Sequence, residues 1–162
     1  LQQCADLVMR LRSEWLYQKK EYGKIAFNTV SGDRLYFLRS SKGDTSYKSF
    51  YKYLLKLFNT ANTWSLAHEM ARVRDRDKIQ IGDVFIRGGF PGHAIIVVDM
   101  ARNYSTGQRI FLVVQSYMPA QDAHVLLNPG NPRLTPWYDL DFGDTLTTPE
   151  WEFTKDQLMT WK

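Results

Sequence analysis

Apolar side chains recur at helical spacing in the first part of the chain. The first stripe is formed by Cys4, Leu7, Val8, Leu11, Trp15 and Leu16. Steps of three and four residues predict an amphipathic helix over residues 4–20, with one face turned to a core. The same periodicity predicts a second helix over residues 46–61, and a shorter helix is expected around residues 64–70.

The pattern changes in the second half of the chain. Runs rich in Val, Ile and Phe predict strands over residues 79–87, 93–101 and 109–117, with shorter strands at 124–127 and 151–153. Earlier, two short β-like runs cover 25–30 and 34–38, residues 72–78 are read as an exposed connection, and a small helix is expected from Thr154. The loops within the 79–117 region are short enough for antiparallel hairpins. Helices followed by an antiparallel sheet indicate an α+β fold.

Composition narrows the classes of protein that fit this pattern. The chain has 162 residues, of which 44% are hydrophobic, so a single domain over residues 1–162 with a real core is expected. Disorder and an integral membrane segment are not expected, because the chain is apolar enough to fold and no apolar run is long enough to span a bilayer. A single cysteine excludes an internal disulfide. Since the chain opens at Leu1, we expect it to be part of a longer precursor.

The net charge of +4 is unevenly distributed. Residues 1–80 carry 15 Lys and Arg against 8 Asp and Glu, a net charge of +7, whereas residues 81–162 carry 6 against 9, a net charge of −3. The basic half coincides with the predicted helices and carries no recognised nucleic-acid motif. We therefore interpret the charge as a solvated helical surface and expect no nucleic-acid partner.

The only cysteine lies at the beginning of the first predicted helix. Its sulfur would lie near the free N–H groups of the first turn, an environment that stabilises a thiolate and lowers the pKa of a cysteine. A thiolate is an effective nucleophile when a histidine lies close enough to take part in proton transfer. Cys4 is also part of the apolar stripe, so an inert buried thiol is the alternative interpretation.

His93 is the histidine that best fits the role of a base. It is the first residue of a predicted strand and directly follows Pro91-Gly92, so its side chain can reach a cleft. In a hairpin of residues 93–101 and 109–117, Gln115 and Tyr117 share its face of the sheet. Gln115 can offer its amide oxygen to one ring N–H, which orients the imidazole. A register slip of one residue would put Ser116 there instead.

The residues beside this trio are candidates for substrate binding, and a metal site is the competing chemistry. Gly92, Ser116 and Tyr117 flank His93 and Gln115 along the chain, and we expect them to contact the substrate. For a metal, Asp122 and His124 would share a face of an extended segment, with His68 or His93 as a further ligand. The spacing of these residues is unspecific, so we expect neither a metal nor another cofactor.

Three stretches of the chain together resemble a known group of enzymes. Cys4-Ala-Asp-Leu-Val, Gly82-Asp-Val-Phe and Gly92-His-Ala-Ile-Ile-Val-Val-Asp resemble the NlpC-type and CHAP-type cysteine peptidases and amidases in their order. The resemblance implies a papain-like fold, in which an N-terminal helix packs on an antiparallel sheet of four to six strands. It also implies that Cys4 is the nucleophile, His93 the base and Gln115 the orienting residue. Glutamine replaces the more frequent His, Asn or Asp, and its amide carries no charge to stabilise an imidazolium.

Nearly the whole chain also resembles a bacterial family known as domain of unknown function 4846. The matching stretches are Gln3-Cys-Ala-Asp-Leu, Gly82-Asp-Val-Phe-Ile, Pro91-Gly-His-Ala-Ile-Ile-Val-Val-Asp and Gln115-Ser-Tyr-Met-Pro-Ala-Gln-Asp. This resemblance implies a periplasmic or envelope-associated protein. We expect a thiol hydrolase or transferase that acts on an amide bond of a cell-wall peptide or a related substrate. The alternative is a catalytically inactive envelope module that binds a peptide or glycan in the same cleft.

Overall fold

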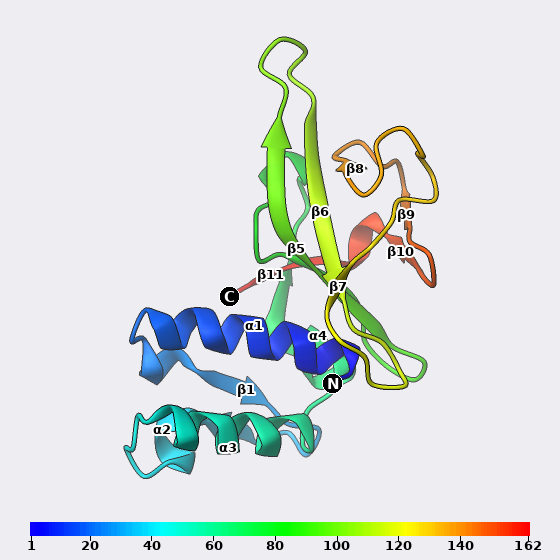
Figure 1. The fold of residues 1–162 in the computed structure, drawn as a ribbon. Coiled ribbons are helices and arrows are strands. Elements are labelled where there is room, and N and C mark those ends of the chain that lie inside the picture. Colours follow the sequence, from blue (N-terminus) through cyan, green and yellow to red (C-terminus); the bar gives the residue numbers. More distant parts are fainter.

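The helices gather at one end of the molecule, and the long strands project towards the opposite end (Figure 1). The computed structural model describes all residues, 1–162. Its helices are α1 (Cys4–Gln18), α2 (Phe37–Ser40), α3 (Tyr47–Phe58) and α4 (Thr63–Glu69). The predicted helices over 4–20, 46–61 and 64–70 correspond to α1, α3 and α4. Together with the antiparallel sheets, they confirm the α+β fold class.

The main sheet has seven strands. Their spatial order is β3 (Met70–Arg72), β11 (Leu158–Trp161), β4 (Val84–Arg87), β5 (His93–Arg102), β6 (Arg109–Gln115) and β7 (His124–Val125), with β8 (Tyr138–Asp139) also paired to β6. Every pairing is antiparallel. The expected four to six strands are too few, because the sequence pattern missed β3, β8 and β11.

The last residues of the chain explain why the sequence pattern predicts too few strands for the main sheet. Thr154 and Gln157 form the capping interaction expected of a helix start, with the Thr154 N–H donating to the Gln157 amide oxygen over 3.0 Å. However, only one 3-10 turn follows, so the prediction of a small helix there is wrong. Leu158–Trp161 instead forms β11, which fills the gap between β3 and β4. Pairing with two strands outweighs local propensity here.

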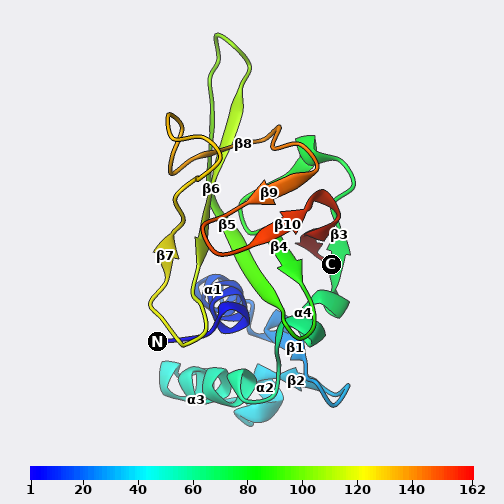
Figure 2. The same cartoon turned by 90° about the vertical axis from the view of Figure 1, so that its right-hand side faces the viewer.

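Two small sheets complete the fold. The β1 (Ala26–Asn28) and β2 (Arg34–Tyr36) strands form a hairpin that corresponds to the two predicted runs, although the second run turns into α2 at Phe37. The β9 (Thr145–Thr147) and β10 (Glu152–Thr154) strands form another hairpin. Figure 2 looks towards the end of α1 near the N-terminus and shows the β9–β10 hairpin above that end.

The main sheet separates two hydrophobic cores. Alternate residues of β5 point to opposite faces, as strand geometry requires. Ala94 and Ile96 pack with Val8 of α1 in one core, which also contains α3 side chains. Ile95 and Val97 belong to the other core, together with Phe153 of β10. Consequently α1 lies on one side of β5 and the β9–β10 hairpin on the other. No helix of the structure is both long and apolar enough to span a membrane.

Candidate functional site

Cys4 is the first residue of α1, and its side chain is buried. The capping interaction between Gln3 and Asp6 fixes the helix start, since the Gln3 N–H donates to the Asp6 carboxylate over 3.0 Å. Only 7% of Cys4 is exposed, and this burial raises the pKa of its thiol, although the backbone N–H groups of Ala94 and Ala5 favour the thiolate. The lowered cysteine pKa expected from the sequence is therefore wrong, because desolvation outweighs the helix-end effect.

His93 and Gln115 lie together in the structure. The amide oxygen Oε1 of Gln115 is 2.7 Å from Nε2 of His93, and the two residues are 1% and 2% exposed, respectively. Both side chains come from strand ends: β5 begins at His93 and β6 ends at Gln115. β5 and β6 pair in the register Ile96–Val114 and Val97–Val113. Because side chains alternate between the two faces along each strand, this register puts His93 and Gln115 on the same face of the sheet.

An aromatic enclosure surrounds the imidazole. The His93 ring is 4.9 Å from the Tyr117 ring, 5.3 Å from the Trp151 ring and 5.9 Å from the Phe153 ring, measured between centroids. Burial in this enclosure lowers the pKa of His93, which the hydrogen bond to Gln115 and the charge of Glu150 partly offset. At neutral pH the ring is therefore uncharged, the protonation state required of a general base.

Cys4 and His93 approach the same end of β5 from different sides. The thiol faces the backbone N–H of Ala94, the residue directly after His93. Ala94 packs with α1, whereas the His93 ring stacks on Phe153 of the β9–β10 hairpin. The protein's hydrogen bonds include none between the thiol and the imidazole. The structure thus brings nucleophile and base candidates to adjacent positions of one strand without joining them directly.

Glu150 and Trp151 belong to this site, and the sequence analysis missed both. The Gln115 amide nitrogen Nε2 donates to the Glu150 carboxylate over 2.8 Å. Glu150 and Trp151 lie in the turn of the β9–β10 hairpin, which follows β6 by about 30 residues. Thr148-Pro-Glu-Trp is recognisable as a turn sequence, but nothing in the sequence pattern shows that this turn docks on His93.

The three residues proposed as substrate contacts have different environments. Tyr117 is half-buried and lies edge-on to His93. Ser116 is fully buried. Gly92 is packed so closely that a Cβ at this position would overlap the Thr63 hydroxyl and the Gly89 carbonyl. Gly92 thus serves the packing of the loop before His93 on the start of α4, and its backbone leaves little space for a substrate.

Buried polar atoms without partners cluster around these residues. The structure has five such side-chain atoms, of which three belong to Gln2, Ser116 and Trp151. Gln2 is two residues before Cys4, Ser116 follows Gln115, and the Trp151 ring contacts His93. Unsatisfied buried polar groups are rare and costly in folded proteins. All three atoms are shielded from solvent, so each is an unpaired polar group inside the protein.

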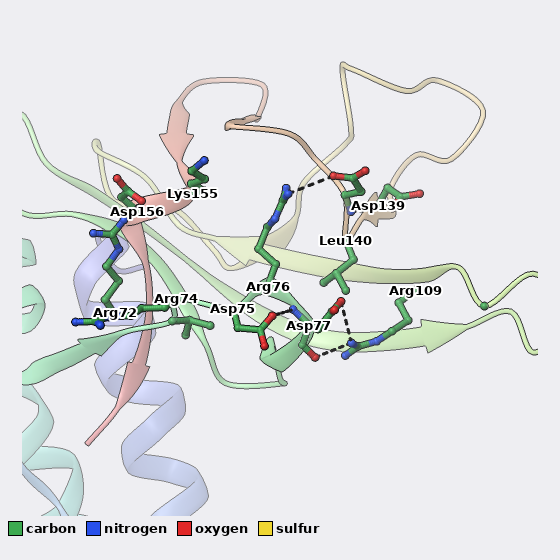
Figure 3. A pocket seen from close by; sticks show the side chains of 13 residues that line it. Arg72, Arg74, Asp75, Arg76, Asp77, Arg109, Asp139, Leu140, Lys155 and Asp156 are labelled. Carbon is green, nitrogen blue, oxygen red and sulfur yellow. Dashed lines mark hydrogen bonds and ion pairs between the residues drawn. The ribbon is translucent and has the colours of Figure 1, made fainter.

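Two sizeable cavities lie away from His93. One, of about 1010 Å³, is lined by five basic and five acidic side chains near β3 and residues 76–78 (Figure 3). Arg76 pairs with Asp141 over 3.4 Å, and Arg72 pairs with Asp156. Because the opposite charges largely neutralise one another, this cavity does not present a basic surface. A second cavity, of about 620 Å³, lies against α1 beside Trp15 and Trp161.

The competing metal site finds no support in the geometry. No three His, Cys, Asp or Glu side chains lie together in a way that could hold a metal ion. The His124 Nδ1 atom lies 3.1 Å from the backbone oxygen of Asp122, and His124 pairs with Gln115 across β6 and β7. His68 is bound to the Trp64 carbonyl at 2.7 Å.

Comparisons with known proteins identify a family but no activity. A family model described as "Domain of unknown function (4846)" matches residues 1–160. No curated protein and no solved structure matches the chain. The match therefore covers almost the whole fold and brings no activity with it.

Proposed function

We propose, from the premise that the chain belongs to the family described as domain of unknown function 4846, that it is a thiol-dependent hydrolase or transferase acting on amide bonds. In this mechanism His93 accepts the thiol proton of Cys4 as the sulfur attacks a substrate carbonyl. Gln115 holds the imidazole. The His93 ring then returns the proton to the leaving amine, and water or a second amine releases the acyl group.

The observation that carries this proposal is the 2.7 Å hydrogen bond between His93 and Gln115, one residue from the point where the Cys4 thiol meets β5. The thiol has a raised pKa and the imidazole a lowered one, so both are neutral at rest. Proton transfer would therefore accompany attack on the carbonyl. The N–H groups at the start of α1 would stabilise the developing oxyanion.

The arrangement of elements supports a papain-like mechanism. A helix begins at the cysteine and packs on an antiparallel sheet, the histidine begins one strand, and the orienting amide ends the next. The resemblance to NlpC-type and CHAP-type enzymes implies this order of elements along the chain. The mechanism also requires the thiol and the imidazole, which approach β5 from different sides, to meet at the end of that strand. The same resemblance makes a cell-wall peptide in the bacterial envelope the proposed substrate and location.

Alkylation of Cys4 tests the proposed pair of nucleophile and base. We expect the rate of iodoacetamide labelling to fall once the pH drops below the lowered pKa of His93, because a protonated His93 cannot accept the thiol proton. His93→Ala should slow labelling at pH 7 by on the order of tenfold or more. Mass spectrometry of the peptide that contains Cys4 gives the rates.

The matched control is His68→Ala, which removes an exposed histidine on α4 that is bonded to the Trp64 carbonyl. Its labelling rate should equal that of the wild type at every pH. Equal rates for His93→Ala and the wild type would refute the proposed mechanism.

One observation favours the second candidate, a non-catalytic module that binds a peptide or glycan. The Cys4 thiol is buried, has a raised pKa and is not hydrogen-bonded to His93. If the protein only binds, Cys4→Ala will bind peptidoglycan fragments as tightly as the wild type and neither form will cleave them. Product formation by the wild type alone decides for the enzyme.

A further inference from the structure

We infer that Glu150 is a positioning residue that fixes the tautomer of His93 through the side chain of Gln115. Glu150 makes no hydrogen bond to His93 itself. It acts on the amide that does, and it thereby leaves Nδ1 of His93 as the proton-accepting atom. The inference rests on the proposed function for its catalytic meaning, but the tautomer itself is measurable without any activity.

The direction of each hydrogen bond follows from what each atom can do. An ionised carboxylate only accepts hydrogen bonds, so the Gln115 group facing Glu150 must be the NH₂ group. The reversed amide would place its oxygen against a carboxylate oxygen, and two acceptors repel. Glu150 therefore turns the Gln115 oxygen towards His93, at 2.7 Å from Nε2.

The acceptor role of the Gln115 oxygen also determines which nitrogen of the imidazole carries the proton. The Gln115 oxygen only accepts, so Nε2 of His93 must carry a proton to bond with it. A neutral imidazole has one proton, and Nδ1 is then left with a free lone pair. Without Glu150, Gln115 could rotate its amide by half a turn and stabilise the opposite tautomer equally well.

Glu150 also supplies the charge that Gln115 lacks. An amide orients an imidazole but cannot compensate the positive charge that forms when the ring accepts a proton. The Glu150 carboxylate lies one side chain away and opposes the lowering of the pKa of His93 by burial. The chain from carboxylate through amide to imidazole thus combines orientation by Gln115 with charge from Glu150.

The turn that carries Glu150 is held in place by hydrogen bonds. The Thr148 hydroxyl donates to the Trp151 carbonyl over 2.7 Å, and the Thr148 N–H donates to the same oxygen over 2.8 Å. Pro149 restricts the backbone at the position before Glu150. The Trp151 ring packs on His93 and fixes the turn against the site. Glu150 is therefore exposed to solvent but attached to a rigid element.

Nitrogen NMR of the whole protein tests this inference. Long-range proton–nitrogen correlation at neutral pH distinguishes the two tautomers of each histidine, and we expect the Nε2–H form for His93 in the wild type. In Glu150→Gln we expect a mixture of both tautomers and a lower His93 pKa. Labelling of Cys4 should slow about tenfold, in line with the smallest loss seen when the hydrogen-bond partner of a metal-binding histidine is removed.

Glu152→Gln is the matched control, because Glu152 lies on the same hairpin and its carboxylate accepts a hydrogen bond from the Thr147 hydroxyl and none from Gln115. It should leave the His93 tautomer and pKa unchanged. An Nδ1–H tautomer in the wild type overturns the inference, and so does an unchanged His93 spectrum in Glu150→Gln. Independence of Cys4 labelling from His93 instead overturns the proposed function, while the tautomer result still stands or falls by itself.

Discussion

At the scale of single residues, burial dominates the electrostatics of the site. Cys4 lies at a helix start, which favours a thiolate, yet desolvation raises the pKa of its thiol. His93 accepts support from Gln115 and Glu150, yet burial lowers its pKa. In both cases removal from water destabilises the charged form by more than the local hydrogen bonds and charges stabilise it. The resting site is therefore uncharged at Cys4 and His93, and its chemistry depends on proton transfer at the moment of reaction.

This burial predicts a pH dependence of stability that belongs to His93. The unfolded histidine binds a proton near pH 6.5, before the folded one does. Stability is therefore fully present above about pH 6.5 and is lost as the pH falls towards the lowered pKa of the folded state. Urea unfolding between pH 5 and 7.5 should show this loss in the wild type.

His93→Gln should remove that slope between pH 5 and 7.5, since glutamine does not titrate. His68→Gln, a change at an exposed histidine on α4, should keep it. A slope that survives in His93→Gln would assign the acid sensitivity to other groups.

At the scale of elements, short connections decide where the site residues lie. The loop before β5 packs on α4, since the Thr63 hydroxyl donates to the Gly89 carbonyl over 3.4 Å and Gly92 leaves room for this contact. The β9–β10 turn brings Glu150 to Gln115 and the Trp151 ring to His93. Each connection is brief, so small changes in either one would move the end of β5.

Gly92→Ala tests the close approach of the loop. The added Cβ would overlap Thr63 and the Gly89 carbonyl, so we expect a loss of about 1–3 kcal/mol of unfolding free energy, as for other overpacked positions. Thermal or urea unfolding measures this loss. Gly23→Ala is the control, because a Cβ there meets no atom within 4 Å and stability should change by less than about 1 kcal/mol. Equal effects at the two positions would contradict this explanation.

At the scale of the whole molecule, β11 connects the two halves of the chain. It pairs with β3, which follows the helices, and with β4, which begins the β-rich half. The Trp161 indole N–H donates to the Gly82 carbonyl over 2.9 Å and ties the same strand to the turn before β4. The last strand thus joins β3 to the rest of the sheet on which both α1 and the β9–β10 hairpin pack.

Leu158→Ala should destabilise the entire fold. Leu158 is fully buried, and truncation of such a leucine typically costs about 2–5 kcal/mol. Leu127→Ala, at an exposed leucine, should change the unfolding free energy by less than about 0.5 kcal/mol. Chemical unfolding followed by fluorescence and circular dichroism measures both. A loss confined to one spectroscopic probe would show that β11 does not couple the two halves.

The sequence by itself determined the features that depend on local periodicity. Spacing of three and four residues defined α1 and α3, and alternation along the β-rich half put His93 and Gln115 on one face of the sheet. These predictions succeeded because helix and strand geometry repeat over neighbouring residues.

Only the tertiary structure decided what depends on contacts between distant segments. The last residues became a strand because the gap between β3 and β4 offered two partners. The thiol of Cys4 gained a raised pKa because the whole fold buries it. Glu150 reached Gln115 because the β9–β10 hairpin folds back over the sheet. Periodicity describes one element at a time, whereas burial and long-range pairing are properties of the assembled chain.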